Sequence, residues 1–427
     1  MSDAPSDLAL GIDVGTSGVR TAVVNSSGKV VSTAKAAHLA TSNEDASAWW
    51  DAVARTLNAQ VQQLRDIGID PQKIARAAVD GTSGSMVLVD EQLTPVTRAL
   101  MYNTSGFTAE AKSIDRFAEP TSITRGSSSA LSRMLRLQAL NQNGHAKHLL
   151  HQADFITAKL AGTSLGSDDN NALKLGWDPA DRTWPNWFEE LGVSMPLLPS
   201  VHPTGTAIGQ IGSQMAARFG LSPTLQLHAG TTDSIAAFLA SGACEVGDAV
   251  TSLGTTLAIK LLSDQRIDDS SSGVYSHRVG DSWLVGGASN TGGGVLASFF
   301  TGDELAALSR QIDPERPSEL DYYPLLTPGE RFPINDPKLA PRLEPRPQGD
   351  VAFLHGMLEG IARIEAVGYS RLVELGSPAP RRVFTAGGGA KNPVWTAIRQ
   401  RLLNTPITQA NEAEASVGVA RLCWRAS

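Results

Sequence analysis

Two short turns combine glycine with hydroxyl residues, a composition that suits phosphate binding. The first is Asp13-Val-Gly-Thr-Ser-Gly18 and the second is Leu253-Gly-Thr-Thr256. Glycine lets backbone N–H groups approach a phosphate closely, and the neighbouring hydroxyls add further donors. The first turn is not a Walker A loop, because no lysine follows Gly18 and the next segment is a predicted strand. Together the turns could hold a triphosphate from opposite sides, although each could also be a plain hairpin turn.

Two aspartates stand where a carboxylate could act on a phosphate or a hydroxyl. Asp13 ends a predicted strand and would suit a hydrated Mg²⁺, which takes one or two carboxylates and keeps its waters. Asp233 follows Gly230-Thr-Thr232 at a predicted helix N-terminus. A carboxylate held there stays ionised near neutrality and could accept the proton of an attacking hydroxyl. The simpler interpretations are a surface aspartate for Asp13 and a helix cap for Asp233.

A glycine run, Gly387-Gly-Gly389, follows a predicted strand and opens a predicted helix. This arrangement places an anion or a nucleotide at a helix N-terminus. A dinucleotide fingerprint would need glycine where Asn392 stands, which disfavours a Rossmann NAD site. Gly388 and Gly389 leave the backbone bare for a flat adenine, and Trp395 could stack on it. Alternatively, Trp395 is a core aromatic residue.

A further strand end, Val79-Asp-Gly-Thr-Ser-Gly-Ser85, is rich in hydroxyls and glycines. Ser83 in this segment could hydrogen-bond a polyol or simply close a turn. The eight histidines form no H-x-x-x-H or H-E-x-x-H pair, so a zinc site has no support in the sequence.

These segments belong to a pattern that occurs twice along the chain. Each half begins with a strand, a turn of glycine and hydroxyl residues, and a second strand. We interpret this as a cryptic duplication that gives two α/β domains with a cleft between them; a chance match is the alternative. The predicted strands are 8–14, 19–24, 29–32, 74–79, 225–229, 249–253, 257–262 and 382–385, the predicted helices are 49–67, 233–239, 350–375, 393–403 and 412–424, and 121–221 is predicted to be mostly helical.

Composition narrows the function classes. The 427 residues carry 43 acidic and 36 basic side chains, a net charge of -7, with no long basic run, which argues against a nucleic-acid partner. No window approaches the roughly 20 apolar residues of a membrane span. Residues 1–7 are acidic and do not resemble a secretory signal. Cys244 and Cys423 are far apart and are interpreted as small core residues of a protein in a reducing compartment. We therefore expect a soluble cytoplasmic protein.

The motifs together resemble those of a known family. Residues 13–18, 252–256 and 385–395 are similar to the two phosphate motifs and the adenosine motif of the FGGY carbohydrate kinases, within the actin-like ATPase superfamily, in the same order and spacing. Residues 198–209 and 354–365 resemble further family segments. The resemblance covers essentially the whole chain.

The resemblance implies two ribonuclease H-like domains with an interdomain cleft. It implies a sugar-binding domain over residues 1–240, with a C-terminal helix at 412–427 packing back on it, and a nucleotide-binding domain over 241–411. The implied activity is ATP-dependent phosphorylation of a sugar or polyol hydroxyl, with ATP and Mg²⁺ as cofactors. The implied partners are the sugar and ATP, without nucleic acid or membrane, in a monomer or homodimer.

The resemblance also implies residue roles. Asp233 corresponds to the catalytic base, and Asp13 with Asp233 to the carboxylates beside the metal and the acceptor. Ser83 corresponds to a sugar contact. The phosphate-binding positions correspond to Thr16, Ser17, Gly254 and Thr255, and the nucleotide site to Gly388, Gly389, Asn392 and Trp395.

The acceptor sugar is suggested by three segments that are similar to the short ribulose-kinase-like group of cyanobacteria and plants: 79–84, 99–103 and 169–178. We therefore expect D-ribulose to be converted to D-ribulose 5-phosphate. The sequence departs from typical members around Met101–Thr104, where the tryptophan, aspartate and arginine pattern that commonly touches the sugar is replaced. The alternatives are D-xylulose or another pentulose or polyol, a non-catalytic actin-like nucleotide switch, and a nicotinamide-dependent oxidoreductase.

Overall fold

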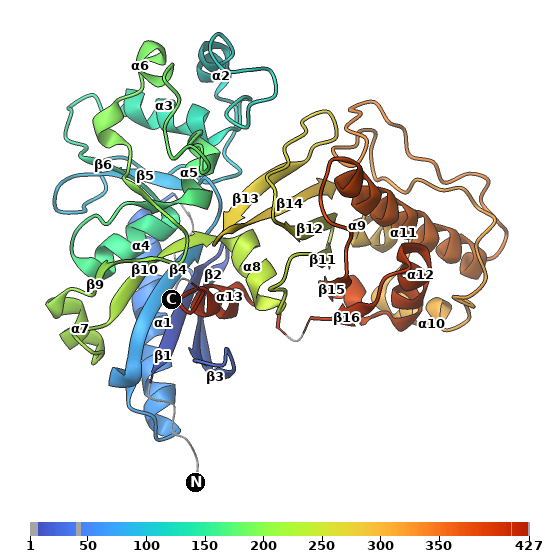
Figure 1. Cartoon of the computed structure of the whole chain (residues 1–427), viewed down its shortest axis with the longest axis horizontal. Coiled ribbons are helices and arrows are strands. Elements are labelled where there is room, and N and C mark those ends of the chain that lie inside the picture. Colours follow the sequence, from blue (N-terminus) through green and yellow to red (C-terminus); the bar gives the residue numbers. More distant parts are fainter. Residues whose placement is uncertain (1–6, 40–43, 411, 426–427) are drawn as a thin grey trace. The chain divides into compact units, whose positions relative to one another are not determined.

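The computed structural model describes residues 7–39, 44–410 and 412–425. The chain divides into two compact units, the first formed by residues 1–240 and 414–427 and the second by residues 241–413 (Figure 1). The N-terminal residues 1–6 and the last two residues of the predicted helix at 412–427 lie outside the described part. Each unit is built around a mixed β-sheet.

The sheet of the first unit has the strand order β3-β2-β1-β4-β10-β9. Strands β1, β2 and β3 form an antiparallel meander, and β4 and β10 add to β1 in parallel. Every residue of β1 is buried, which explains its almost continuous apolar sequence. The bounds are Leu8–Val14 for β1, Gly18–Asn25 for β2, Val30–Ala37 for β3, Ile74–Gly81 for β4, Ala207–Gln210 for β9 and Gln226–Thr232 for β10.

The sheet of the second unit repeats this topology in the order β13-β14-β12-β11-β15-β16. Here β11, β12 and β14 form the antiparallel part, and β15 and β16 follow β11 in parallel. The bounds are Asp248–Leu253 for β11, Leu257–Ser263 for β12, Tyr275–Val279 for β13, Ser282–Ser289 for β14, Arg382–Ala386 for β15 and Ile407–Gln409 for β16. Apart from β9 and β13, the two sheets share one strand order and one set of directions. This confirms the predicted duplication and the two ribonuclease H-like α/β domains.

The first unit gains its layers from helices on its sheet. Helix α1 (Ala46–Asp66) packs on β2 and β3, and α13 (Ala415–Leu422) packs on β1, β2 and α8 (Asp233–Ala240). The contact of α13 is very close. A Cβ atom at Gly418 would lie 1.7 Å from the carbonyl oxygen of Ala236, so only glycine fits there.

A separate layer lies between β4 and β10 in the sequence and has its own apolar core. The prediction of a mostly helical region there is only partly right, because this layer also contains short strands that pair as β5 with β6 and β7 with β8. Strands of two to four residues are too short to show a period. The helices of this layer are α2 (Thr108–Ile114), α3 (Ala130–Leu140), α5 (Asp169–Leu175) and α6 (Phe188–Leu191), and the strands are β5 (Met86–Val89), β6 (His148–His151), β7 (Ser167–Asp168) and β8 (Val201–His202). Two further helices of this stretch, α4 (Gln152–Ala161) and α7 (Ser213–Phe219), place their buried residues in the core of the six-stranded sheet.

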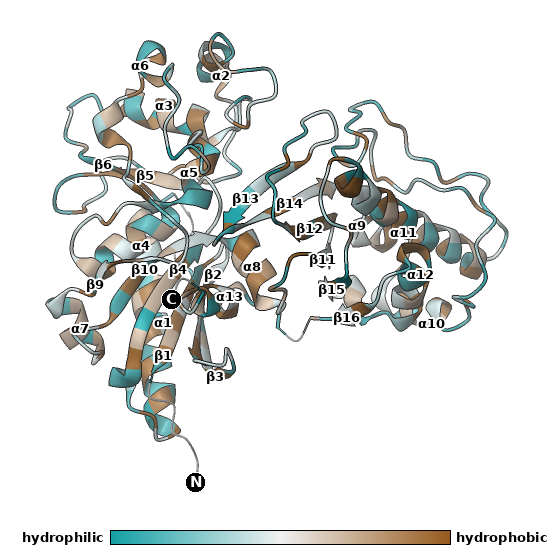
Figure 2. Ribbon diagram, in the orientation of Figure 1, coloured by the Kyte–Doolittle hydropathy of each residue, from teal (hydrophilic) through white to brown (hydrophobic). Residues whose placement is uncertain are grey.

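The helices of the second unit are α9 (Gly293–Ala297), α10 (Gly302–Ser309), α11 (Asp350–Glu374) and α12 (Pro393–Leu403). This unit also contains the short 3-10 turn η3 (Gly388–Lys391), and the first unit contains η1 (Pro71–Lys73) and η2 (Met195–Leu197). Helix α11 alternates apolar and polar residues along its length (Figure 2). Its apolar residues Leu354, Leu358 and Ile361 are fully buried, as the predicted amphipathic pattern requires.

A buried ion pair ties these helices to the sheet. Arg399 on α12 donates to both carboxylate oxygens of Glu365 on α11, at 2.6 and 2.8 Å, and both side chains are fully buried. Thr251 on β11 donates to the same carboxylate, and Arg399 also donates to Thr385 on β15. Because both charged groups have these hydrogen-bond partners, the ion pair fixes β11 and β15 against α11 and α12.

Two further predictions concern single residues and membrane spans. Cys423 is buried, as predicted, but the core prediction for Cys244 is wrong, because Cys244 lies exposed in the connection between α8 and β11. Across the described ranges, none of the helices combines the length and the apolar character that crossing a bilayer would require.

Candidate active site

In the first unit, three parallel strands end together and bring polar side chains to one edge of the sheet. Asp13 at the end of β1 stands in register with Asp80 of β4, and Asp80 stands in register with Thr231 of β10. Asp233 follows β10 directly. The carboxyl ends of neighbouring parallel strands are the usual place for ligands in α/β sheets, so this edge is a candidate site.

Asp13 is nearly buried, with 5% of its surface exposed. The Nη1 atom of Arg20 lies 3.5 Å from its carboxylate. Burial raises the pKa of Asp13 to about 6; Arg20 opposes this rise and the negative charge of Asp233 adds to it. A second positive charge beside Asp13 would therefore stabilise its ionised carboxylate.

Asp80 is the main site residue that the sequence analysis missed. It is fully buried, and neither carboxyl oxygen accepts a hydrogen bond from a donor in the described part of the chain. Burial and the neighbouring carboxylate of Asp13 raise the pKa of Asp80 well above its usual value. In the segment 79–85 the sequence analysis predicts a role for the hydroxyl of Ser83 and none for Asp80.

Asp233 is the more accessible carboxylate of this edge. It is partly exposed and is the first residue of α8, which begins straight after β10. The predicted helix start is therefore correct, although Asp233 lies inside the helix rather than before it. Its Oδ1 atom accepts a hydrogen bond from the backbone N–H of Ser234 at 2.6 Å. Position and exposure fit a base that must reach a substrate hydroxyl.

Ser83 lies in the turn between β4 and β5. Its hydroxyl is buried and has no partner among the described residues. The turn is held by its neighbour Thr82, whose backbone N–H and hydroxyl both donate to Gln152 Oε1, and whose hydroxyl lies 2.6 Å from that of Ser85. The rigid turn leaves the Ser83 hydroxyl for a ligand.

The turn after β1 exposes Thr16 and Ser17, the predicted phosphate-binding residues of this unit. The turn closes with a backbone hydrogen bond from Gly15 to Gly18. His38 braces it from the end of β3: its Nε2 atom lies 2.9 Å from the carbonyl oxygen of Gly15, and its backbone N–H donates to the carbonyl of Ser17. The hydroxyls are thus presented on a fixed loop.

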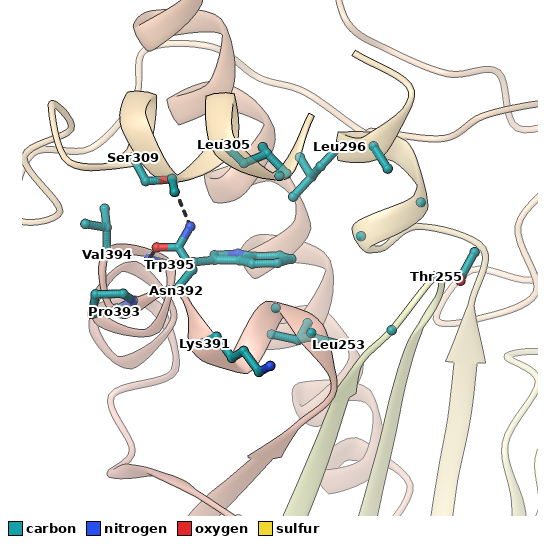
Figure 3. A pocket seen from close by; sticks show the side chains of 18 of the residues that line it. Leu253, Thr255, Leu296, Leu305, Ser309, Lys391, Asn392, Pro393, Val394 and Trp395 are labelled. Atoms are coloured by element: carbon teal, nitrogen blue, oxygen red, sulfur yellow. Dashed lines mark hydrogen bonds between the residues drawn. The ribbon is translucent and has the colours of Figure 1, made fainter. Parts of the chain in front are cut away.

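The second unit contains a cavity of about 760 Å³ (Figure 3). The cavity is lined by all the residues of this unit that the sequence analysis assigned to phosphate and nucleotide binding, namely Gly254, Thr255, Gly388, Gly389, Asn392 and Trp395. These residues come from the β11–β12 turn, η3 and the start of α12. The structure therefore brings together two segments that are more than a hundred residues apart.

Asn392 and Trp395 shape one wall of this cavity. Asn392 caps α12 by accepting from the N–H of Trp395, and its Nδ2 atom donates to the Ser309 hydroxyl at 2.9 Å (Figure 3). Trp395 is only 2% exposed, and its indole N–H donates to the carbonyl of Leu358. A Cβ atom on Gly389 would lie 2.6 Å from the Trp395 ring. Trp395 is thus a core aromatic residue that also borders the cavity.

Helices α9 and α10 supply most of the lining that the sequence did not predict. The backbone N–H groups of Gly293 and Gly294 donate to the carbonyls of Gly254 and Thr255, which fixes the β11–β12 turn. The glycine run at 292–294 follows a strand much as 387–389 does, and this signal could have found it. The remaining missed lining residues are Leu253, Leu296, Ala297, Gly302, Leu305, Ala306, Ser309, Arg310, Lys391, Pro393 and Val394.

The chemistry of the two sites differs. The edge of the first unit offers carboxylates and hydroxyls, whereas the cavity of the second unit offers bare glycine backbone and apolar side chains with Arg310 and Lys391 at its lining. In the described residues, no group of three or more Asp, Glu, His or Cys side chains is arranged to hold a metal ion. Mg²⁺ needs only one or two carboxylates when phosphates and waters complete its shell. Asp13 and Asp233 could supply them.

Comparison with known proteins agrees with this division. Residues 8–240 match the N-terminal domain, and residues 249–427 the C-terminal domain, of the FGGY family of carbohydrate kinases. The xylulose kinases of Bacillus subtilis (strain 168) and Escherichia coli (strain K12) are each 24% identical to this chain over 97% of its length and over 87% and 89% of their own.

Solved structures give the same architecture. The xylulose kinase from Rhodospirillum rubrum superposes with a TM-score of 0.85 at 21% identity, over 97% of this chain and 89% of that one. The Plasmodium falciparum glycerol kinase with ADP superposes with a TM-score of 0.83 at 14% identity, over 98% and 89%. These likenesses establish the two-domain actin-like fold. With both family domains matched along nearly its whole length, this chain belongs to the FGGY carbohydrate kinases and is a sugar kinase.

Proposed function

We propose that this sugar kinase transfers the terminal phosphoryl group of ATP to the terminal hydroxyl of D-ribulose, giving D-ribulose 5-phosphate. The observation that carries the proposal is the edge where β1, β4 and β10 end. There the partly exposed Asp233 stands beside buried carboxylates, and the Ser83 hydroxyl is without a protein partner in the described chain. Such an edge suits a small polyhydroxyl acceptor.

The cavity of the second unit fits ATP. A volume of about 760 Å³ falls within the usual range for small-molecule sites. Gly388 and Gly389 would carry the adenine, while Gly254 and Thr255 would donate to phosphate oxygens. In the first unit, Thr16 and Ser17 are the residues that we propose for phosphate binding. When bound, ATP supplies the phosphoryl group.

The carboxylates of the first unit fit Mg²⁺. Asp13 is buried beside Arg20, and burial raises its pKa to about 6, with the negative charge of Asp233 adding to the rise. A divalent cation would stabilise the charged form of these carboxylates. Asp13 and Asp233 would hold the ion together with phosphates and waters. When bound, Mg²⁺ neutralises charge on the phosphates.

The chain's own residues then carry out the proton transfer and the positioning. Asp233 accepts the proton of the acceptor hydroxyl as its oxygen forms the new bond to the γ-phosphorus. The bond between this phosphorus and the bridging oxygen breaks, and ADP leaves with that oxygen. The side chain of Ser83 donates to, or accepts from, a hydroxyl farther along the sugar. Each step therefore conserves atoms and charge.

D-xylulose is the second candidate acceptor, favoured by the names of the relatives described above. It differs from D-ribulose only in configuration at C3, so the discrimination rests on the side chains that contact the middle of the sugar. We further propose that the protein acts in the cytoplasm as a monomer or homodimer.

The test is an ADP-release assay with ATP and Mg²⁺ across D-ribulose, L-ribulose, D-xylulose, glycerol and common aldoses. We expect the highest kcat/KM with D-ribulose. A higher value with D-xylulose would keep the reaction and replace the substrate. No sugar-dependent ADP release from a protein that binds ATP would contradict the proposal.

A further inference from the structure

A buried arginine joins three segments of the first unit. Arg133 lies in the first turns of α3 and is only 3% exposed. Its Nε atom donates to the carbonyl oxygen of Gly84 at 3.0 Å. Its Nη1 atom donates to the carbonyls of Tyr102, Thr104 and Ser128, at 2.9, 3.2 and 2.6 Å. One guanidinium group thus holds backbone from segments that are otherwise distant in the sequence.

This guanidinium is costly to bury. Its hydrogen bonds within the described chain all go to backbone carbonyls and none to a carboxylate, and burial lowers the pKa of Arg133 to about 10. Removing a charge from water without an opposite charge nearby is unfavourable. A neutral side chain could fill the same space but would not supply the fork of donors that binds these carbonyl groups.

The segments that Arg133 holds are those assigned to the acceptor. Gly84 directly follows Ser83, whose hydroxyl is free for a ligand, and residues 101–104 replace the family's usual sugar-contacting pattern. The backbone N–H of Tyr102 also donates to the Ser85 hydroxyl at 2.9 Å. The turn carrying Ser83 and the 101–104 segment are therefore joined by hydrogen bonds, most of them from Arg133. We call these two segments together the acceptor wall.

Gly84 shows how tight the arrangement is. Its φ of +79° lies in the left-handed region, and a Cβ atom there would lie 2.8 Å from Nη2 of Arg133. Because the other guanidinium nitrogens are already engaged, the side chain has little freedom to move aside. The wall thus depends on a glycine and an arginine that fit each other.

We propose that Arg133 is a positioning residue that sets acceptor affinity and selectivity by holding the turn of Ser83 against the 101–104 segment. This inference rests on the proposed function, because it takes these segments as the acceptor wall. The 101–104 segment contains no arginine, and Arg133 of α3 binds its backbone carbonyls instead. The role is exerted through backbone carbonyls and not by touching the reacting atoms.

The test compares Arg133→Met with Arg136→Met in the full chain. Arg136 lies one turn further along α3, is half exposed and pairs with Glu110 at 2.6 Å, so it is a matched control on the same helix. We expect Arg133→Met to raise KM for the acceptor at least tenfold and to reduce the preference between D-ribulose and D-xylulose. KM for ATP should stay within about twofold, since the nucleotide cavity lies in the other unit. Arg136→Met should change neither constant.

Arg133→Lys keeps the charge with fewer donors and should give an intermediate KM, which also covers the case in which the methionine variant does not fold. An unchanged acceptor KM and an unchanged sugar preference in a folded variant would overturn the inference. So would an equal rise of both KM values. The proposed function fails separately, if the wild-type protein shows no turnover with any pentulose. If the wild-type protein uses another acceptor, the ratio of KM in Arg133→Met to KM in the wild type is measured with that acceptor.

Discussion

Asp233 differs from the other carboxylates at its sheet edge in one respect that matters for catalysis. Asp13 and Asp80 are buried, whereas Asp233 is partly exposed at the start of α8. A general base must come within hydrogen-bond reach of the proton that it removes. Its accessibility supports our proposal that Asp233 is the base, with electrostatic roles for its buried neighbours.

Replacing Asp233 by alanine should lower kcat by about 10²- to 10⁴-fold, the usual contribution of a general base. ATP affinity should be largely kept, because the cavity lined by Gly388 and Gly389 lies in the other unit. Steady-state kinetics and calorimetric titration with ATP would measure the two quantities. A variant that turns over at the wild-type rate would remove Asp233 from this role.

Asp80 should make stability depend on pH. Its folded pKa is raised by burial and by Asp13, so its favourable contribution is complete below the unfolded pKa of about 3.8 and is lost as pH rises through the folded pKa. Asp80→Asn lacks this titration. We expect the variant to gain stability relative to wild type as pH rises from 4 to 8.

Urea unfolding at several pH values would measure this difference. Asp90→Asn is the control: Asp90 is a partly exposed aspartate in the loop after β5, and its side chain accepts from the backbone N–H groups of Gln92 and Thr94. A difference between Asp80→Asn and wild type that stays constant with pH would contradict the assignment of a raised pKa.

Among the helices, α13 packs closely on α8 because Gly418 has no side chain. In an isolated helix, replacing glycine by alanine stabilises by about 1 kcal/mol. At Gly418 the added Cβ would lie 1.7 Å from the carbonyl oxygen of Ala236, closer than atoms can approach. Overpacking of this kind costs about 1–3 kcal/mol or more, so the steric effect outweighs the gain in helix propensity.

Gly418→Ala should therefore destabilise the protein by about 2 kcal/mol or more. Gly349→Ala is the control, because no atom lies within 4 Å of its added Cβ and its backbone is extended. It should cost about 1 kcal/mol or less, because glycine is preferred over alanine at a helix N-cap. Equal stability of Gly418→Ala and wild type in chemical unfolding would show that α13 does not pack as described.

The regular elements were the easiest to predict. The strand over 8–14 and the helix over 393–403 have the predicted bounds, because each is a strongly apolar or periodic run between clear punctuation. The short strands β5 to β8 escaped prediction, since their pairing depends on distant partners.

The site was predicted unevenly for the same reason. Glycine and hydroxyl turns identified part of the lining of the cavity. Asp80 has the same position at a strand end as Asp13, but the sequence does not show that it is buried, and Arg133 carries no local signal. Their importance arises from burial and from partners more than fifteen residues away, which only the fold brings together.

At the scale of the whole molecule, two units of one topology carry different chemistry. The first unit holds the carboxylate edge and the second holds the cavity. A substitution in the cavity should therefore change one substrate's KM and not the other's. Gly388 is suited to this test, because it lines the cavity and an added Cβ would meet no protein atom within 4 Å.

Gly388→Ala should raise KM for ATP by about 5- to 30-fold, which corresponds to about 1–2 kcal/mol of lost binding. Thermal stability and KM for the sugar should remain at wild-type values. Gly389→Ala is the contrasting variant, since its Cβ would lie 2.6 Å from Trp395 and should destabilise the unit itself. An unchanged KM for ATP in Gly388→Ala would argue that the nucleotide binds elsewhere.

We propose one phosphoryl transfer to a pentulose, which uses the carboxylate edge of the first unit and the cavity of the second. The most direct measurement follows ADP and sugar phosphate together, by phosphorus NMR, in a reaction of ATP, Mg²⁺ and D-ribulose with the wild-type protein and with Asp233→Ala. We predict equal amounts of ADP and D-ribulose 5-phosphate from the wild type, and neither product at a comparable rate from the variant. ADP formed without a sugar phosphate, or at the same rate in both proteins, would contradict the claim.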